Sequence, residues 1–176
     1  MRDFISRDTY LVVDGHAILN FARQSIPTYE PGHRLNSGPH GNMGVGIPSG
    51  VGAKVARPDQ PVVVLTGDGA FGWNGMEMDT AVRYNLPILV VISNNGGYTS
   101  QKTGGRYSSS QRELGFTRYD LMMEAIGCHG EWVEDPDGIR PALERAAASG
   151  KPAIVNVKTD PFTQAATDVG FGRGYE

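Results

Sequence analysis

A carboxylate and two amides follow two apolar runs in the middle of the chain. Asp68 stands in a Gly-Asp-Gly sequence directly after the run 62–66, and Asn94 and Asn95 directly follow the run 88–93. One carboxylate accompanied by amide and carbonyl oxygens suits a hard cation such as Mg²⁺ better than Zn²⁺. The glycines, and the start of a helix after them, offer backbone N–H groups to an anion. These residues therefore predict a site in which Mg²⁺ holds a diphosphate.

The elements around these residues must bring them together. The run 62–66 is rich in β-branched residues, as expected of a buried parallel strand, and we expect a glycine turn and then a helix over 76–85. Pro87 restarts the chain into a second strand over 88–93. Adjacent parallel strands end at the same edge of a sheet, which is where open α/β sheets bind ligands. Asp68 and the two asparagines are therefore expected at one sheet edge.

A dinucleotide site is the weaker interpretation of the same segment. Residues 67–72 fit the pattern G-x-G-x-x-G, follow a strand and precede a helix. A dinucleotide fold would also need an acidic residue at the end of the next strand, where it binds the ribose. That strand ends in Ser93-Asn94-Asn95, which contains no carboxylate.

An earlier turn is a second candidate for holding phosphate. We expect a strand over 10–13, then a turn with a glycine, then a helix over 17–24. This arrangement makes Gly15, His16 and Ala17 candidate phosphate contacts. For His16, a solvent-exposed turn residue is an equally good interpretation.

The remaining chain continues the alternation of strands and helices. We expect a glycine-rich turn and a helix of small residues over 41–57, helices over 116–126 and 136–148, and strands over 129–133 and 153–158. The fold class predicted is α/β, with a doubly wound, mainly parallel six-stranded sheet and helices on both faces. Residues 1–159 would form this domain, and 160–176 a C-terminal tail that serves as a lid or a partner contact.

Two long segments are expected to be loops. The connector 25–40 is rich in proline and glycine, and its two histidines, His33 and His40, are candidates for substrate contact or simply exposed residues. The polar segment 98–115 is expected to cover the site, with Tyr98, Gln101 and Arg106 able to reach a substrate or to stay solvated.

Composition excludes several classes of function. The net charge of −3 gives no electrostatic footprint for nucleic acid. Cys128 is the single cysteine, so an internal disulfide is excluded and a reducing compartment is favoured; it is expected to be a buried small residue. No apolar run approaches the length of a membrane span, and the first residues lack a signal-peptide core, which favours the cytoplasm.

The paired motifs resemble those of thiamine diphosphate (ThDP)-dependent enzymes. Between Gly69 and Asn94 lie residues 70 to 93, which is 24 residues, a spacing within the range of this family's motif. The whole chain resembles the diphosphate-binding (PP) domain of these enzymes. Residues 14–56 together with 67–87 look most like the C-terminal third of 2-hydroxyacyl-CoA lyases and oxalyl-CoA decarboxylases. Acetohydroxyacid synthase and benzaldehyde lyase come next.

The resemblance assigns roles to individual residues. Asp68, the side chain of Asn95 and the carbonyl of Gly97 would bind Mg²⁺, and Asn94 would serve the loop instead. The carbonyl of Gly41 would accept a hydrogen bond from the 4′-amino group of ThDP. Met43 would be the wedge that bends the cofactor into a V shape, the alternative being plain core packing. The further cofactor contacts implied are Gly15, His16, Ala17, Gly67, Gly69, Ala70, Tyr98 and Thr99.

The resemblance also implies an activity. We expect a lyase, with ThDP and Mg²⁺ as cofactors, that cleaves the carbon-carbon bond of a 2-hydroxyacyl-CoA to give an aldehyde or ketone and formyl-CoA, or runs the reverse reaction. The alternatives are a 2-oxoacid decarboxylase or an acetolactate-forming synthase, and, in another class, a non-catalytic cofactor-binding regulatory subunit.

A partner is expected because the family needs a glutamate from a pyrimidine-binding (PYR) domain. That domain is absent from this sequence, so the chain would be a natural small subunit or a part of a longer protein. We expect a hetero-oligomer with a larger PYR-domain subunit and two-fold symmetry. The glycine-rich face 41–52, with Met43 and Ile47, would be exposed in a monomer and form the interface.

Overall fold

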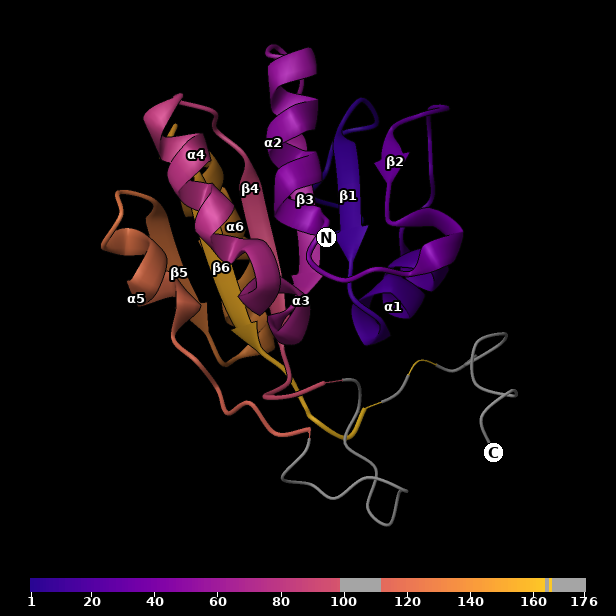
Figure 1. Cartoon of the computed structure of the whole chain (residues 1–176), viewed down its shortest axis with the longest axis vertical. Helices are drawn as coiled ribbons and strands as arrows, with labels where there is room; N and C mark the ends of the chain where they lie inside the picture. Colours follow the sequence, from indigo (N-terminus) through magenta and orange to yellow (C-terminus); the bar gives the residue numbers. More distant parts are fainter. Residues whose placement is uncertain (99–111, 164, 166–176) are drawn as a thin grey trace.

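The strands form one parallel sheet. The computed structural model describes residues 1–98, 112–163 and 165. Within this part of the chain the sheet has six strands in the order β2-β1-β3-β4-β6-β5, and every neighbouring pair is parallel. The strands are β1 (Tyr10–Asp14), β2 (Arg34–Leu35), β3 (Val62–Gly67), β4 (Leu89–Asn94), β5 (His129–Val133) and β6 (Ala153–Lys158). In Figure 1 the strand arrows point toward the end where the segments after β1, β3, β4 and β6 gather.

The predicted fold class is confirmed, although one strand lies where a connector was expected. β2 is only two residues long and pairs with Leu11 and Val12 at the edge of the sheet. So short an edge strand has no hydrophobic pattern of its own, and its position depends on the hydrogen bonds that β1 offers.

Helices cover both faces of the sheet. In the described part of the chain they are α1 (Ala17–Ser25), α2 (Gly46–Ala56), α3 (Asp68–Asn74), α4 (Met78–Arg83), α5 (Tyr119–Glu124) and α6 (Pro136–Ala148), with short 3₁₀ turns η1 (Gly38–His40) and η2 (Gly75–Glu77). α6 begins as its sequence predicts, because Pro136 occupies the first position and the Asp135 carboxylate accepts a hydrogen bond from the backbone N–H of Asp137 at 2.9 Å. α2, α3, α4 and α5 lie on one side of the sheet and α6 on the other (Figure 1).

The alternation of strand residues divides the core in two. One cluster joins residues of α1 and α6 to one sheet face, and the other joins residues of α2, α3, α4 and α5 to the opposite face. Within β3, for example, Val63 and Leu65 belong to the first cluster and Val62 and Val64 to the second. Both faces of the central strands are therefore buried, which explains their continuous apolar sequences.

Helix boundaries near the site differ from the prediction. α3 begins directly at Asp68, where a glycine turn was expected before a helix from residue 76. The glycine-rich sequence of this helix conceals it from propensity arguments, because glycine is a poor helix former. Asp68 is thus the first residue of a helix rather than a turn residue.

The expectation that residues 41–52 expose a glycine-rich face holds for Gly41 and Gly52, but it is wrong for Ile47 and for the three glycines between Gly41 and Gly52, which are buried. Ile47 is only 2% exposed and packs in the core beneath α2. Gly50 faces β3 so closely that a Cβ there would stand 2.4 Å from Val64 Cγ2. The buried glycines of α2 therefore allow it to approach the sheet, and of the two apolar residues only Met43 remains partly exposed.

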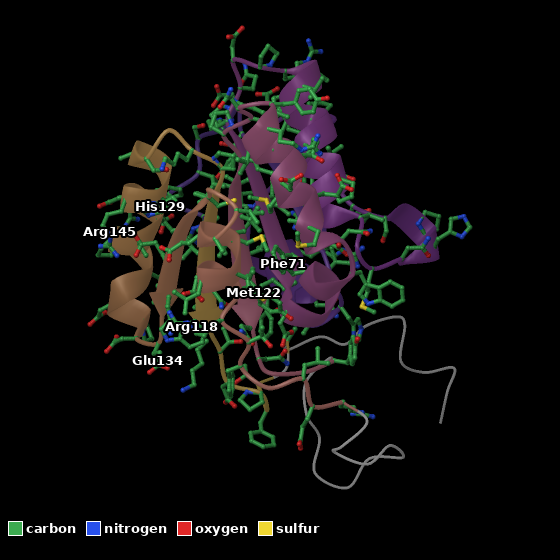
Figure 2. The ribbon with its side chains drawn as sticks, turned by 60° about the vertical axis from the view of Figure 1, so that its left-hand side comes forward. Phe71, Arg118, Met122, His129, Glu134 and Arg145 are labelled. Carbon is green, nitrogen blue, oxygen red and sulfur yellow. The ribbon has the colours of Figure 1, made fainter. Side chains whose placement is uncertain are left out.

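The outer edge of the sheet is held by charged groups. The Glu131 carboxylate on β5 accepts hydrogen bonds from Arg145 of α6 at 2.7 and 2.9 Å, and it bonds the His129 ring at 2.9 Å. Figure 2 shows His129 and Arg145 together on this edge. Charged side chains on an edge strand disfavour further strand pairing.

Across the described residues, no helix combines the length and the apolar character that a membrane crossing requires.

Candidate functional site

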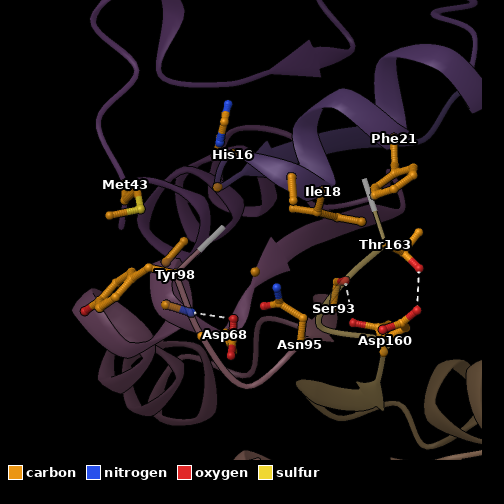
Figure 3. Close-up of a pocket in the computed structure, with 17 residues that line it drawn as sticks. His16, Ile18, Phe21, Met43, Asp68, Ser93, Asn95, Tyr98, Asp160 and Thr163 are labelled. Carbon is orange, nitrogen blue, oxygen red and sulfur yellow. Dashed lines mark hydrogen bonds between the residues drawn. The ribbon is translucent and has the colours of Figure 1, made fainter. Parts of the chain in front are cut away.

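A cavity of about 570 Å³ opens at the carboxyl edge of the sheet. β3 and β4 end side by side there, with Gly67 opposite Ser93 in the register. The wall is contributed by the turns after β1, β3 and β4, by the start of α1, by Met43 and by the segment that follows β6 (Figure 3). Its lining residues are Gly15, His16, Ala17, Ile18, Phe21, Met43, Gly67, Asp68, Gly69, Ala70, Ser93, Asn95, Gly97, Tyr98, Thr159, Asp160 and Thr163.

Asp68 carries a buried and half-satisfied carboxylate in this cavity. The residue is 2% exposed, and its Oδ1 accepts a hydrogen bond from the backbone N–H of Gly69 at 2.9 Å. Its Oδ2 is buried without a hydrogen-bond partner among the described residues. Burial raises the pKa of this carboxyl to about 6, against the smaller opposing effect of nearby backbone N–H groups. A buried carboxylate oxygen without a partner calls for a cation or a proton.

Two glycines bring the backbone turns close together. Gly15 has a φ of +105°, and a Cβ there would press on the backbone nitrogen of Gly67 at 3.3 Å. A Cβ on Gly69 would stand 2.8 Å from the ring of Tyr98. Both positions therefore exclude a larger side chain, so Gly15 and Gly69 contribute bare backbone to the cavity that they line.

The start of α1 adds an electrostatic preference for anions. Its N-terminus at Ala17 has no side-chain cap and no acidic residue in the first turn. The unpaired N–H groups of such a terminus favour a negatively charged group in front of it. Gly15, His16 and Ala17 all line the cavity at this point, so the helix start faces the same space as Asp68.

The turn after β4 is fixed by a buried amide network. Asn94 is fully buried; its side-chain oxygen accepts from the backbone N–H of Gly96 at 3.2 Å, and its amide nitrogen donates to the Thr117 carbonyl at 3.1 Å. The same nitrogen donates to the side-chain oxygen of Asn156 on β6 at 3.1 Å. Asn94 therefore holds the loop, while Asn95 and Gly97 line the cavity.

The network ends in an ion pair between the buried Asp120 and the exposed Arg118. Asn156 donates to the Asp120 carboxylate at 3.0 Å, and Arg118 pairs with the same carboxylate at 2.6 Å. Burial of Asp120 would raise its pKa, but the hydrogen bonds from Arg118 and Asn156 outweigh burial and lower the pKa below its usual value. Asp120 thus stays charged and anchors α5 to the site loop.

Most predicted site residues meet at this cavity. All of them line it except Gly41, which is exposed outside the wall, and Thr99, which lies outside the described residues, as do Gln101 and Arg106. His33 stacks on Tyr10 at 4.1 Å between ring centroids and does not line the cavity, and neither does His40. The binding roles assigned to individual residues remain predictions.

Sequence reasoning missed part of the wall. The apolar Ile18 and Phe21 of α1 form one side, and Ser93 with the segment after β6 forms another. Residues 160–176 were expected to be a tail that serves as a lid or a partner contact; of these, Asp160 and Thr163 line the cavity, and the Thr163 hydroxyl donates to the Asp160 carboxylate at 2.8 Å (Figure 3). The one available signal was topological, because β6 pairs with β4 and must therefore end beside Asn94.

Comparisons with known proteins agree with this geometry. Residues 15–157 match the family described as "Thiamine pyrophosphate enzyme, C-terminal TPP binding domain". The chain belongs to this family. The assignment confirms the resemblance seen in the paired Gly-Asp-Gly and Asn-Asn motifs, since thiamine pyrophosphate is ThDP.

The relatives of this thiamine pyrophosphate domain catalyse different reactions. A probable acetolactate synthase of Mycobacterium bovis is 47% identical over 161 residues, which is 89% of this chain and 29% of the relative. Oxalyl-CoA decarboxylase of Escherichia coli K12 is 41% identical over 89% of the chain and 28% of the relative. A 2-hydroxyacyl-CoA lyase of Arabidopsis thaliana is 37% identical over 92% of the chain and 31% of the relative. The chain thus spans about 30% of the length of these relatives.

A solved structure shares the fold. The Rhodococcus jostii RHA1 thiamine diphosphate-dependent 4-hydroxybenzoylformate decarboxylase matches with a TM-score of 0.79 and 23% identity. The match covers 92% of this chain and 31% of that one. It supports the doubly wound sheet as the fold of this domain.

The residues that line the cavity are of the chemical types that could bind ThDP and a metal ion. The unpaired Asp68 oxygen suits a hard cation, and the glycine turns with the start of α1 suit the diphosphate that such a cation holds. In the described residues no group of three or more His, Cys, Asp or Glu side chains could hold a metal. The predicted ligands are of another kind, namely one carboxylate, one amide oxygen and one carbonyl.

Proposed function

We propose that this domain forms the diphosphate- and metal-binding part of a ThDP- and Mg²⁺-dependent enzyme that breaks or forms a carbon-carbon bond in a 2-hydroxyacyl-CoA. The observation that carries the cofactor assignment is the buried Oδ2 of Asp68, which has no partner among the described residues, on a residue that lines the cavity together with the glycine turns and the start of α1. When bound, ThDP supplies a nucleophilic carbon that can hold the electron pair of the broken bond.

The chain's own residues would hold and shape the cofactor. Asp68, the Asn95 side chain and the Gly97 carbonyl would bind Mg²⁺, and the turn at Gly15 with the start of α1 would bind diphosphate oxygens. Met43, 37% exposed at the cavity wall, would support the bent form of the cofactor. The apolar side chains Ile18 and Phe21 would exclude water from one side of the cavity.

The acyl-CoA assignment rests on similarity. Oxalyl-CoA decarboxylase and 2-hydroxyacyl-CoA lyase, two of the relatives described above, act on CoA esters as their names state. A second candidate function is acetolactate synthesis from a 2-oxoacid, favoured by the 47% identity to a probable acetolactate synthase. Both candidates use the same half of the site and differ in the substrate that reaches it.

The activating glutamate is proposed to come from a PYR domain outside the described residues. No glutamate is among the described residues that line the cavity, and the relatives are about three times as long as this chain. A larger PYR-domain subunit, in a hetero-oligomer with two-fold symmetry, would supply it.

The test is a comparison of substrates on the assembled enzyme. This chain is purified together with the protein that completes the site, loaded with ThDP and Mg²⁺, and given a 2-hydroxyacyl-CoA or pyruvate. Formation of formyl-CoA and an aldehyde supports the lyase, whereas formation of acetolactate supports the synthase. Turnover of neither substrate, with ThDP bound, would contradict both.

A further inference from the structure

Gly44 is held from both sides by polar side chains of other elements. The Asp14 carboxylate, at the end of β1, accepts a hydrogen bond through Oδ2 from the backbone N–H of Gly44 at 2.9 Å. The same oxygen accepts from the backbone N–H of Gly46, the first residue of α2, at 2.7 Å. On the other side, the Asn74 side chain at the end of α3 donates to the Gly44 carbonyl at 2.9 Å.

Steric contacts tighten this arrangement. Gly44 has a φ of +87°, and a Cβ there would stand 2.8 Å from the Cβ of Trp73. A Cβ on Gly46 would stand 2.8 Å from the Cβ of Asp14. The backbone at 44–46 is therefore packed closely between Asp14 of β1 and Trp73 of α3. Met43, which lines the cavity, directly precedes this segment.

Asp14 and Asn74 together clamp the backbone at 44–46, and the carboxylate of Asp14 is costly to bury. Asp14 is 3% exposed, and its Oδ1 has no hydrogen-bond partner among the described residues. Burial raises its pKa, and the backbone N–H groups of Gly46, Gly15, Gly44 and Val45 offset this only in part. A carboxylate in such a place is unfavourable for folding alone, which indicates a role beyond packing.

We propose that Asp14, together with Asn74, is a positioning residue: it fixes the Met43–Gly46 backbone so that Met43 presents its side chain to the pyrimidine half of ThDP. This inference rests on the proposed function. It predicts that loss of the clamp weakens contacts with the pyrimidine half of ThDP but not contacts with diphosphate and Mg²⁺, because the clamp acts on Met43 and not on the turns that would hold those groups.

The test compares two probes on the assembled enzyme. Mg²⁺-dependent binding of ThDP and of inorganic diphosphate is measured by calorimetry for the wild type, Asp14→Ala, Asp14→Asn and Asn74→Ala. Loss of one or two hydrogen bonds should weaken ThDP binding by about 10-fold in Asp14→Ala. Inorganic diphosphate should bind within about 2-fold of the wild type, because its contacts lie elsewhere. Asn74→Ala should change the ThDP affinity in the same direction, and it should leave the protein folded because Asn74 is exposed.

Asp14→Asn is the conservative variant. Its amide oxygen can accept from both Gly44 and Gly46, so its ThDP affinity should lie near that of the wild type. Asp135→Ala is the matched control, since Asp135 also accepts a backbone N–H through its carboxylate but caps α6 away from the cavity.

Amide hydrogen exchange read by NMR gives an independent measure on the chain alone. Exchange of the Gly44 and Gly46 N–H groups should be faster in Asp14→Ala and unchanged in Asp135→Ala.

Three results would overturn the inference. Equal loss of affinity for ThDP and for inorganic diphosphate would show general damage to the cavity, and unchanged ThDP affinity in Asp14→Ala would show that the clamp does not reach the cofactor. If wild-type protein binds neither probe, the proposed function fails and the positioning role fails with it. A wild type that binds both probes separates the two proposals.

Discussion

Asn94 and Asn156, on neighbouring strands β4 and β6, share a buried side-chain hydrogen bond of 3.1 Å. Both also donate to the Thr117 carbonyl, at 3.1 and 3.0 Å. The loop that carries the predicted metal ligands is therefore tied to the neighbouring strand and to the chain before α5. The position of Asn95 thus depends on a residue that no motif identifies.

The first prediction concerns this network. Asn156→Ala should destabilise the domain by about 1–3 kcal/mol, because Asn94 and Asp120 each lose a buried partner. Urea unfolding measures the change. The control is Arg83→Ala, which breaks an exposed pair with Asp79 on α4 and should lower the free energy of unfolding far less than Asn156→Ala does. A loss no larger than that of the control would show that the network contributes little.

The second prediction concerns the pH dependence of Asp68. Its pKa is 3.8 in the unfolded chain and about 6 in the fold, so the folded state holds the proton more tightly. Below pH 3.8 the carboxyl is protonated in both states; as the pH rises from 3.8 to 6 the unfolded state loses its proton first and stability falls. Above pH 6 the loss reaches up to about 3 kcal/mol.

Asp68→Asn removes this titration. Without ligand the variant should be more stable than the wild type at pH 8 and similar to it at pH 3.5, as measured by urea unfolding at both values. With Mg²⁺ and ThDP added to the assembled enzyme, only the wild type should gain stability. A stability difference that is the same at both pH values would assign the effect to packing rather than to the charge.

The third prediction uses two glycines of α2 that differ in their surroundings. Gly50→Ala should destabilise the domain by about 1–3 kcal/mol, because the new Cβ would stand 2.4 Å from Val64 Cγ2. Gly52→Ala meets no atom within 4 Å and should stabilise the helix by about 0.5–1 kcal/mol. Thermal unfolding of both variants gives the comparison. In a Gly50→Ala/Val64→Ala double variant the two losses should not add, and simple additivity would refute the proposed clash.

The fourth prediction concerns Met43. Met43→Ala should leave the fold intact, because the side chain is partly exposed, but should slow hydrogen exchange at C2 of ThDP bound to the assembled enzyme. NMR of the exchanging C2 proton measures the rate. Met122→Ala truncates a methionine of similar exposure on α5, away from the cavity, and should not change it. An unchanged exchange rate in Met43→Ala would show that Met43 only packs.

The sequence predicts the sheet well because its buried strands have simple physical signatures. The central strands read as β-branched runs, and Asp68 and Asn95 could be placed at one edge because parallel strands end together. β2 could not be predicted, since its two residues depend on pairing with β1. The start of α3 was concealed by its glycines, and the close approach of Gly69 to Tyr98 exists only in three dimensions.

Tertiary packing also determines which partner each predicted segment contacts, and the sequence alone does not reveal this. The small residues of α2 are compatible with contact to a ligand, a helix or a sheet, and only the structure shows that β3 fills this role. Asp14 directly follows the strand predicted over 10–13, but its contact with Gly44 links residues 30 positions apart. Cys128 was expected to be buried and is, and burial raises the pKa of its thiol to about 11.

The last prediction concerns the missing half of the site. The carboxylates among the described residues that line the cavity are those of Asp68 and Asp160; the first is assigned to Mg²⁺, and the second bonds Thr163 and the backbone N–H of Phe162. Both therefore already have an assigned or observed partner, which is consistent with the proposal that a PYR domain supplies the activating glutamate. The 176-residue chain alone should bind ThDP weakly and should not turn over a 2-hydroxyacyl-CoA or pyruvate.

Addition of the PYR-domain protein should restore both binding and turnover, and a variant of that protein in which the glutamate is replaced by glutamine should restore binding with little turnover. Turnover is followed by release of formyl-CoA or acetolactate, and binding by calorimetry. The control is the Asp68→Ala chain with the intact PYR-domain protein, which should lose Mg²⁺-dependent ThDP binding because the buried metal ligand is gone. Rapid turnover by the isolated wild-type chain would contradict the divided site, since the described cavity would then need no second domain to activate ThDP.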